Sequence, residues 1–131
     1  MRRDFHLPAA DEDLLNTLGR AWETTLDCGI RWVLIHGRLV PAGYTVSSVS
    51  EAHRIDAGYP DTQLDMVYFF PALHRNDGRP IGAQTTQQIC GQTWQRWSRH
   101  REAGYPWRPG VDDLASHLML VDHWLEREFV Q

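Results

Sequence analysis

Cysteine is scarce in this sequence, and long apolar runs and metal-binding motifs are missing from it. Two cysteines in 131 residues, Cys28 and Cys90, do not make the disulfide framework of a small secreted domain. No CxxC, HxH or HExxH pattern is present, which argues against a zinc site. No apolar run approaches the roughly 20 residues that cross a bilayer, and the basic N-terminus lacks the apolar core of a secretory signal. We therefore expect a cytoplasmic protein without a metal, a cofactor or a membrane partner.

An excess of positive charge is also lacking. The net charge of −4 argues against nucleic-acid binding through a broad basic surface, although it allows local basic patches. The chain carries 42% hydrophobic and 23% charged residues, as soluble globular proteins do. Its 131 residues predict one domain, residues 1–131, with a core of its own and a loosely held arm over residues 1–10.

Tryptophan and arginine are concentrated in one stretch, residues 91–113, which reads GQTWQRWSRHREAGYPWRPGVDD. It contains three of the six tryptophans and four arginines: Trp94, Trp97, Trp107, Arg96, Arg99, Arg101 and Arg108. Three interpretations compete: a basic, aromatic surface for single-stranded nucleic acid, a long ordered loop around an active site, or an irregular segment whose tryptophans fill the core. The acidic net charge and the absence of a nucleic-acid-binding motif make the first the weakest, so we expect no nucleic-acid partner.

Helical signals stand at the two ends of the chain. Asp11 is a candidate N-cap for a short helix over residues 12–18. Leucine and valine at helical spacing predict a C-terminal amphipathic helix over residues 111–128, with Asp112 or Asp113 as its N-cap.

The middle of the chain carries the strand signals. β-branched and aromatic residues predict four strands, over residues 22–27, 31–35, 45–55 and 64–70. Their short connections favour a four-stranded antiparallel meander. Residues 72–88 are polar and rich in turn signals, which predicts a long irregular segment. Together these elements predict an α+β fold.

This order of elements resembles the ubiquitin-conjugating enzyme fold. In that fold a Tyr-Pro pair precedes the last strand, a His-Pro-Asn turn follows it, and a Trp-x-Pro element precedes the next helix. The matching residues here are Tyr59-Pro60, His74-Arg75-Asn76 and Trp107-Arg108-Pro109. More specifically, the chain resembles the bacterial family called prokaryotic ubiquitin-conjugating-like family E. The resemblance extends over nearly the whole chain, and it rests on the strings LDMVYFFPAL (64–73), WQRWSRHR (94–101) and WRPGVDDLASHL (107–118).

The resemblance implies an acyl transferase. A conjugating enzyme accepts the C-terminus of a ubiquitin-like protein as a thioester on a thiol, beside a donor that stabilises the oxyanion. Cys90 is the only thiol between the turn that contains Asn76 and the Trp-x-Pro element, so it is the expected nucleophile. Asn76 is then the expected oxyanion donor, and His100 the group that activates the thiol or the incoming amine. The implied partners are a ubiquitin-like protein, single or tandem, a ThiF-type activating enzyme and a JAB-type metallopeptidase of the same pathway.

A departure from the family pattern leaves a second interpretation open. The usual enzymes place the cysteine a couple of residues after a glycine, whereas Cys90 precedes Gly91. Matching Gly91 to that glycine moves the cysteine position to Trp94, and the thiol is then missing. The alternative is a catalytically inactive adaptor that binds the ubiquitin-like protein or the activating enzyme without forming an adduct. In that case Cys90 is a small buried hydrophobe, Asn76 an ordinary turn residue and His100 a partner of loop backbone.

Overall fold

The structure is a computed structural model that describes residues 1–130. In chain order its elements are α1 (Ala9–Thr17), β1 (Trp22–Asp27), β2 (Ile30–Leu39), β3 (Ser48–Arg54), β4 (Val67–Phe70), β5 (Gln84–Ile89), β6 (Gln92–Trp97) and α2 (Leu114–Arg127). All strands form one antiparallel sheet in the order β1-β2-β3-β4-β6-β5. The α+β class is therefore confirmed. The four predicted strands correspond to β1–β4, which pair in chain order, but the prediction that they make up the whole sheet is wrong because β6 and β5 extend it to six strands.

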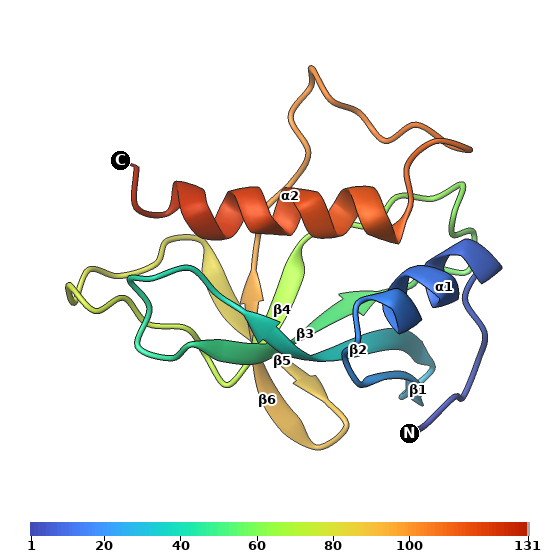
Figure 1. The fold of residues 1–131 in the computed structure, drawn as a ribbon, viewed down its shortest axis with the longest axis horizontal. Helices are drawn as coiled ribbons and strands as arrows, with labels where there is room; N and C mark the ends of the chain where they lie inside the picture. Colours follow the sequence, from blue (N-terminus) through green and yellow to red (C-terminus); the bar gives the residue numbers. More distant parts are fainter. Residues whose placement is uncertain (131) are drawn as a thin grey trace.

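Both helices lie on the same side of the sheet (Figure 1). α2 runs along this face, α1 lies near β1 and β2, and residues 98–113 loop out beyond α2. Two apolar clusters fill the space between the helices and the sheet. Val33 and Ile35 of β2 pack with Leu114 and Leu118 of α2, while Trp97 of β6 packs with the C-terminal half of α2.

The strands that the sequence did not indicate are β5 and β6. β5 reads QTTQQI, and only Ile89 among its residues is buried. Such a strand has no apolar alternation, so its pattern is that of a polar loop. It is held by pairing with β6, in a register that runs from Gln84 opposite Trp97 to Ile89 opposite Gln92. The irregular segment consequently begins only after Trp97, not at residue 91.

The β5–β6 hairpin folds against the face of the sheet opposite α2, which we call the outer face. Ile89 and Trp94 are buried there in a third apolar cluster. The cluster also contains Trp32 and Leu34 of β2 and Tyr68 of β4. Because side chains alternate along a strand, Trp32 and Leu34 point away from the helices. The hairpin thus covers apolar surface that the helices do not reach.

The helix starts differ in how well the sequence indicated them. α1 begins at Ala9 with Pro8 at its N-cap, so the assignment of Asp11 as N-cap is wrong. Asp11 is instead buried in the first turn, where it accepts a hydrogen bond of 2.6 Å from the Tyr59 hydroxyl. For α2, one of the two expected N-cap residues is correct. Asp113 is its N-cap, and it exchanges hydrogen bonds with Ser116 in a capping box.

Charged and imidazole side chains are buried between the sheet and α2. Glu51 lies 3.1 Å from Arg38 Nε and 3.1 Å from His53 Nε2. The Arg38 approach is off the line of a hydrogen bond, so it is an ion pair. His117 of α2 stacks edge-on against His53 at 5.0 Å and donates from Nε2 to the Met66 carbonyl at 2.9 Å. Burial holds the pKa of His117 at about 3, below its usual 6.5, and His53 adds to this effect.

The unfolding free energy should fall as the pH drops below 6.5, because the unfolded chain binds a proton at His117 that the folded chain does not accept until about pH 3. One such group changes the unfolding free energy by about 1.4 kcal/mol per pH unit. Urea unfolding followed by tryptophan fluorescence between about pH 7 and about pH 5 measures this slope. His117→Gln keeps a donor for the Met66 carbonyl and should flatten the slope. An unchanged slope in this variant would assign the pH dependence to another group.

Candidate functional site

Cys90 occupies the turn between β5 and β6. The two turn residues, Cys90 and Gly91, both have positive φ, 50° and 78°. Two-residue hairpin turns of this kind favour Asn or Asp before Gly, because those side chains tolerate the left-handed region. The turn itself therefore gives no reason for a cysteine at this position. Cys28-Gly29 forms a matching turn between β1 and β2, also with φ of 50° and 78°.

The thiol of Cys90 is accessible and lies beside two polar side chains. Cys90 is exposed, so it is not the buried hydrophobe of the alternative interpretation. Its Sγ lies 3.4 Å from Thr25 Oγ1 and 3.7 Å from Arg2 Nη1. Its backbone N–H donates to Asp27 Oδ2 at 3.1 Å. The tip of the β5–β6 hairpin therefore contacts β1, although these strands stand at opposite ends of the sheet order.

The N-terminal segment places Arg2 in this site. The backbone N–H of Thr24 donates to the Arg2 carbonyl at 3.0 Å, and Arg3 forms a parallel bridge with Thr24. Arg2 Nη1 also donates to Thr25 Oγ1 at 2.7 Å. The segment expected to be a loosely held arm is thus bonded along β1 and contributes a charged side chain beside Cys90.

Asn76 lies in the turn after β4, and its side chain is already hydrogen bonded. Its backbone N–H donates to the Gly43 carbonyl at 2.8 Å, and Nδ2 donates to the Tyr44 carbonyl at 3.1 Å. Both bonds tie the turn to the loop between β2 and β3. Within the described residues, Asn76 makes no hydrogen bond to Cys90 or to any partner of Cys90. Its amide therefore has a structural partner in this conformation.

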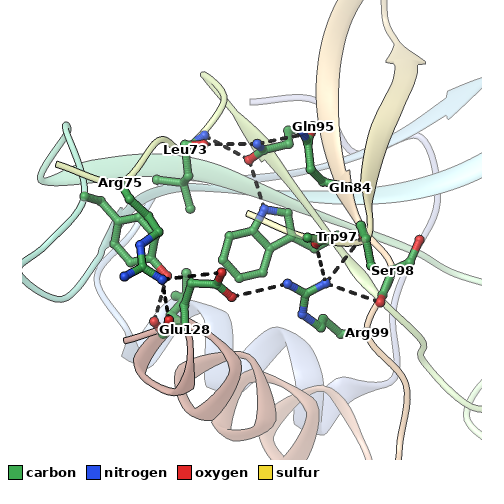
Figure 2. A network of polar contacts seen from close by, with 12 residues as sticks. Leu73, Arg75, Gln84, Gln95, Trp97, Ser98, Arg99 and Glu128 are labelled. Atoms are coloured by element: carbon green, nitrogen blue, oxygen red, sulfur yellow. Dashed lines mark hydrogen bonds and ion pairs between the residues drawn. The ribbon is translucent and has the colours of Figure 1, made fainter. Parts of the chain in front are cut away.

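The neighbouring Arg75 binds the same turn to the end of α2 (Figure 2). Arg75 Nη1 donates to the Glu128 carbonyl at 2.6 Å, and its guanidinium lies 4.8 Å from the centre of the Phe129 ring. The Glu128 carboxylate also pairs with Arg99 at 3.4 Å, so two arginines converge on one residue. These contacts fix the turn against the C-terminal end of the helix.

His100 lies in the segment after β6, where its Nδ1 is 3.0 Å from the Asp65 carboxylate. It stands at the edge of a cavity of about 730 Å³ between α2 and this segment. The apolar part of the cavity wall comes from Tyr105, Leu120 and Trp124. Cys90 is not among the lining residues, so His100 faces a different part of the molecule.

Within the described residues, no hydrogen bond joins any two of the three predicted site residues, Cys90, Asn76 and His100. Each has its own partners, and the surroundings of Cys90 are instead Arg2, Thr25 and Asp27. Sequence reasoning missed all three. The two Cys-Gly pairs were a usable signal for hairpin turns. No local pattern, however, indicates that the tips of two separate hairpins meet.

These features define an α+β protein with an accessible thiol, consistent with the ubiquitin-conjugating architecture. A model of prokaryotic E2 family E matches residues 7–128. The chain belongs to this family, which confirms the resemblance recognised in the sequence and gives it a ubiquitin-conjugating-like role in general. Comparisons with curated proteins and with solved structures found no match.

The described part of the chain has neither a metal-binding cluster nor a membrane-spanning helix. Residues 1–130 contain no group of three or more His, Cys, Asp and Glu side chains arranged to hold a metal ion. None of the helices within those residues has the length and apolar character needed to cross a membrane.

Asn76→Ala should lower the unfolding free energy by about 1 kcal/mol, because the bond from Nδ2 to the Tyr44 carbonyl is lost. Urea unfolding measures this change. If a ubiquitin-like protein is loaded onto Cys90, the loading rate should stay within about twofold of wild type, since the Asn76 amide is bonded to the Tyr44 carbonyl. A large loss of the loading rate without a loss of stability would support Asn76 as an oxyanion donor.

Proposed function

We propose that this chain accepts the C-terminus of a ubiquitin-like protein from an activating enzyme, as a thioester on Cys90, and transfers it to a target. The observation that carries the proposal is the accessible sulfur beside Arg2 and Thr25, in a member of a conjugating-like family. A nucleophile with hydrogen-bond donors around it is the arrangement that acyl transfer requires.

The loading step exchanges one thioester for another. Cys90 loses its proton, and its sulfur bonds to the carbonyl carbon of the thioester on the activating enzyme. The carbonyl oxygen becomes an oxyanion until the bond to the activating enzyme's sulfur breaks and that thiolate takes up the proton. No oxidant or reductant is consumed. Arg2 Nη1 and Thr25 Oγ1, at 3.7 and 3.4 Å from Sγ, are positioned to donate to the oxyanion.

The absence of lysine from this sequence simplifies the test of a thioester on Cys90. All 13 residues counted as lysine or arginine are arginines. A ubiquitin-like protein transferred to residues 1–131 therefore has no lysine side chain to attach to. An adduct that thiols cleave is then assigned to a cysteine without a competing side-chain isopeptide.

A second candidate function is that of an adaptor without covalent chemistry. Asn76 and His100, the groups expected to assist the thiol, are bonded elsewhere. An adaptor would form a complex with the ubiquitin-like protein or the activating enzyme, measurable by calorimetry, and wild-type chain would give no adduct under single-turnover conditions.

Cys90→Asn should abolish the adduct formed with activating enzyme, ATP and ubiquitin-like protein, because the acceptor sulfur is removed. The substitution is suited to the turn, since Asn tolerates the positive φ of 50°. Intact-mass spectrometry before and after thiol treatment measures the adduct. Cys28→Asn is the matched control, because it changes the same residue type at the same φ. A thiol-labile adduct on Cys90→Asn would exclude Cys90 as the acceptor.

Arg2→Ala should slow adduct formation by at least roughly tenfold, because one oxyanion donor is lost from a partly solvated site. Quenched-flow gels under single-turnover conditions give this rate. Arg79→Ala is the control, since Arg79 is exposed and lies in the turn region after β4 rather than near Cys90. Equal rates for both variants would remove Arg2 from the chemistry.

A further inference from the structure

The two edges of the sheet are not alike. On the β1 edge, Asp4 N–H donates to the Thr24 carbonyl at 2.9 Å and Thr24 N–H donates to the Arg2 carbonyl at 3.0 Å, so the chain's own N-terminal segment covers that edge. The β5 edge pairs with β6 on one side, and no other strand among residues 1–130 pairs with it. The sheet therefore ends in one covered and one open edge.

The outward backbone groups of β5 follow from its register. Ser98 N–H donates to the Ala83 carbonyl at 2.9 Å, so Ala83 belongs to the ladder with β6. Because inward and outward residues alternate in an antiparallel pair, Gln84, Thr86 and Gln88 direct their N–H and C=O groups away from β6. The Gln87 side chain covers the Gln88 carbonyl at 3.1 Å. The remaining outward N–H and C=O groups of Gln84, Thr86 and Gln88 can pair with the backbone of an added strand.

Open edges are usually protected by charge, proline or a bulge, because they otherwise pair with other chains. β5 has none of these: its residues QTTQQI are uncharged and contain no proline, and its pairing with β6 has no register shift. Its residues from Gln84 to Thr86 are exposed. The edge is therefore competent to bind an extended peptide by strand addition.

The position of Cys90 indicates which kind of peptide binds this edge and in which direction. β5 ends at Ile89, and Cys90 is the next residue. A strand parallel to β5 brings its own C-terminus to Cys90. An antiparallel strand would leave its C-terminus beside Gln84, roughly 20 Å away for six extended residues. We propose that the extended C-terminal tail of the ubiquitin-like protein adds to the β5 edge in the parallel direction and thereby presents its terminal carbonyl to Cys90. This inference rests on the proposed function, since it supplies the binding mode for that substrate.

Thr86→Pro tests the edge. It removes an outward N–H and leaves the ladder with β6 intact, which is the position at which strands tolerate proline. Thr86→Ala is the matched control, because it keeps the N–H. The concentration of ubiquitin-like protein that gives half the maximal loading rate should rise about tenfold or more in Thr86→Pro and stay near wild type in Thr86→Ala. Equal values in the two variants overturn edge binding while adduct formation on Cys90 stands.

A second measurement separates the two proposals. Amide hydrogen exchange of Cys90→Asn, which forms no thioester, is recorded with and without a peptide of about ten residues from the tail of the same ubiquitin-like protein. Edge binding predicts slower exchange at Gln84, Thr86 and Gln88. Slower exchange together with no adduct on wild type retains edge binding and rejects the thioester. A dimer of the free protein that Thr86→Pro dissociates assigns the edge to a second copy and overturns the proposal.

Discussion

The position of Cys90 depends on the packing of the β5–β6 hairpin against the outer face of the sheet. Ile89 and Trp94 supply the buried contacts, against Trp32, Leu34 and Tyr68. Fully burying a side chain such as Ile89 contributes roughly 1.5–3 kcal/mol, and Trp94 buries a larger side chain still. These two residues therefore hold the hairpin against the sheet. Because the turn lies just beyond Ile89, the same packing brings the thiol to Arg2 and Thr25. The site is thus a consequence of tertiary contacts on the face that the helices leave uncovered.

The opposite face is organised around polar groups rather than apolar ones alone. The buried polar side chains beneath α2 are Arg38, Glu51 and His53. His117, on α2, packs against His53. Burial alone would raise the pKa of Glu51, but its contacts with His53 and Arg38 outweigh burial and lower it. Removing one member of such a group leaves an uncompensated charge in the core, which is more costly than the loss of an exposed ion pair. The buried polar group beneath α2 therefore contributes to the stability of the fold, whereas the packing on the outer face positions Cys90.

The sequence was informative where pattern and burial agree. β1 was predicted with the observed limits, and Asp113 caps α2 as one of two expected residues. The strand β5 was not predicted from the sequence, because its side chains are polar and exposed and the strand is formed by backbone pairing with β6. Asn76 and His100 were singled out by the family pattern, but a motif does not report which backbone group an amide will bind. Arg2 was not predicted as a site residue either, because its contact with Cys90 joins residues that are 88 positions apart in the sequence.

The most direct test of a thioester on Cys90 is peptide mapping of the loaded protein by mass spectrometry, after acidic digestion without reductant. If Cys90 carries the thioester, the mass of the C-terminal remnant of the ubiquitin-like protein is found on the peptide that contains Cys90 and disappears when a thiol is added. A remnant on the peptide that contains Cys28, or a remnant that survives thiol at the N-terminus, would contradict it.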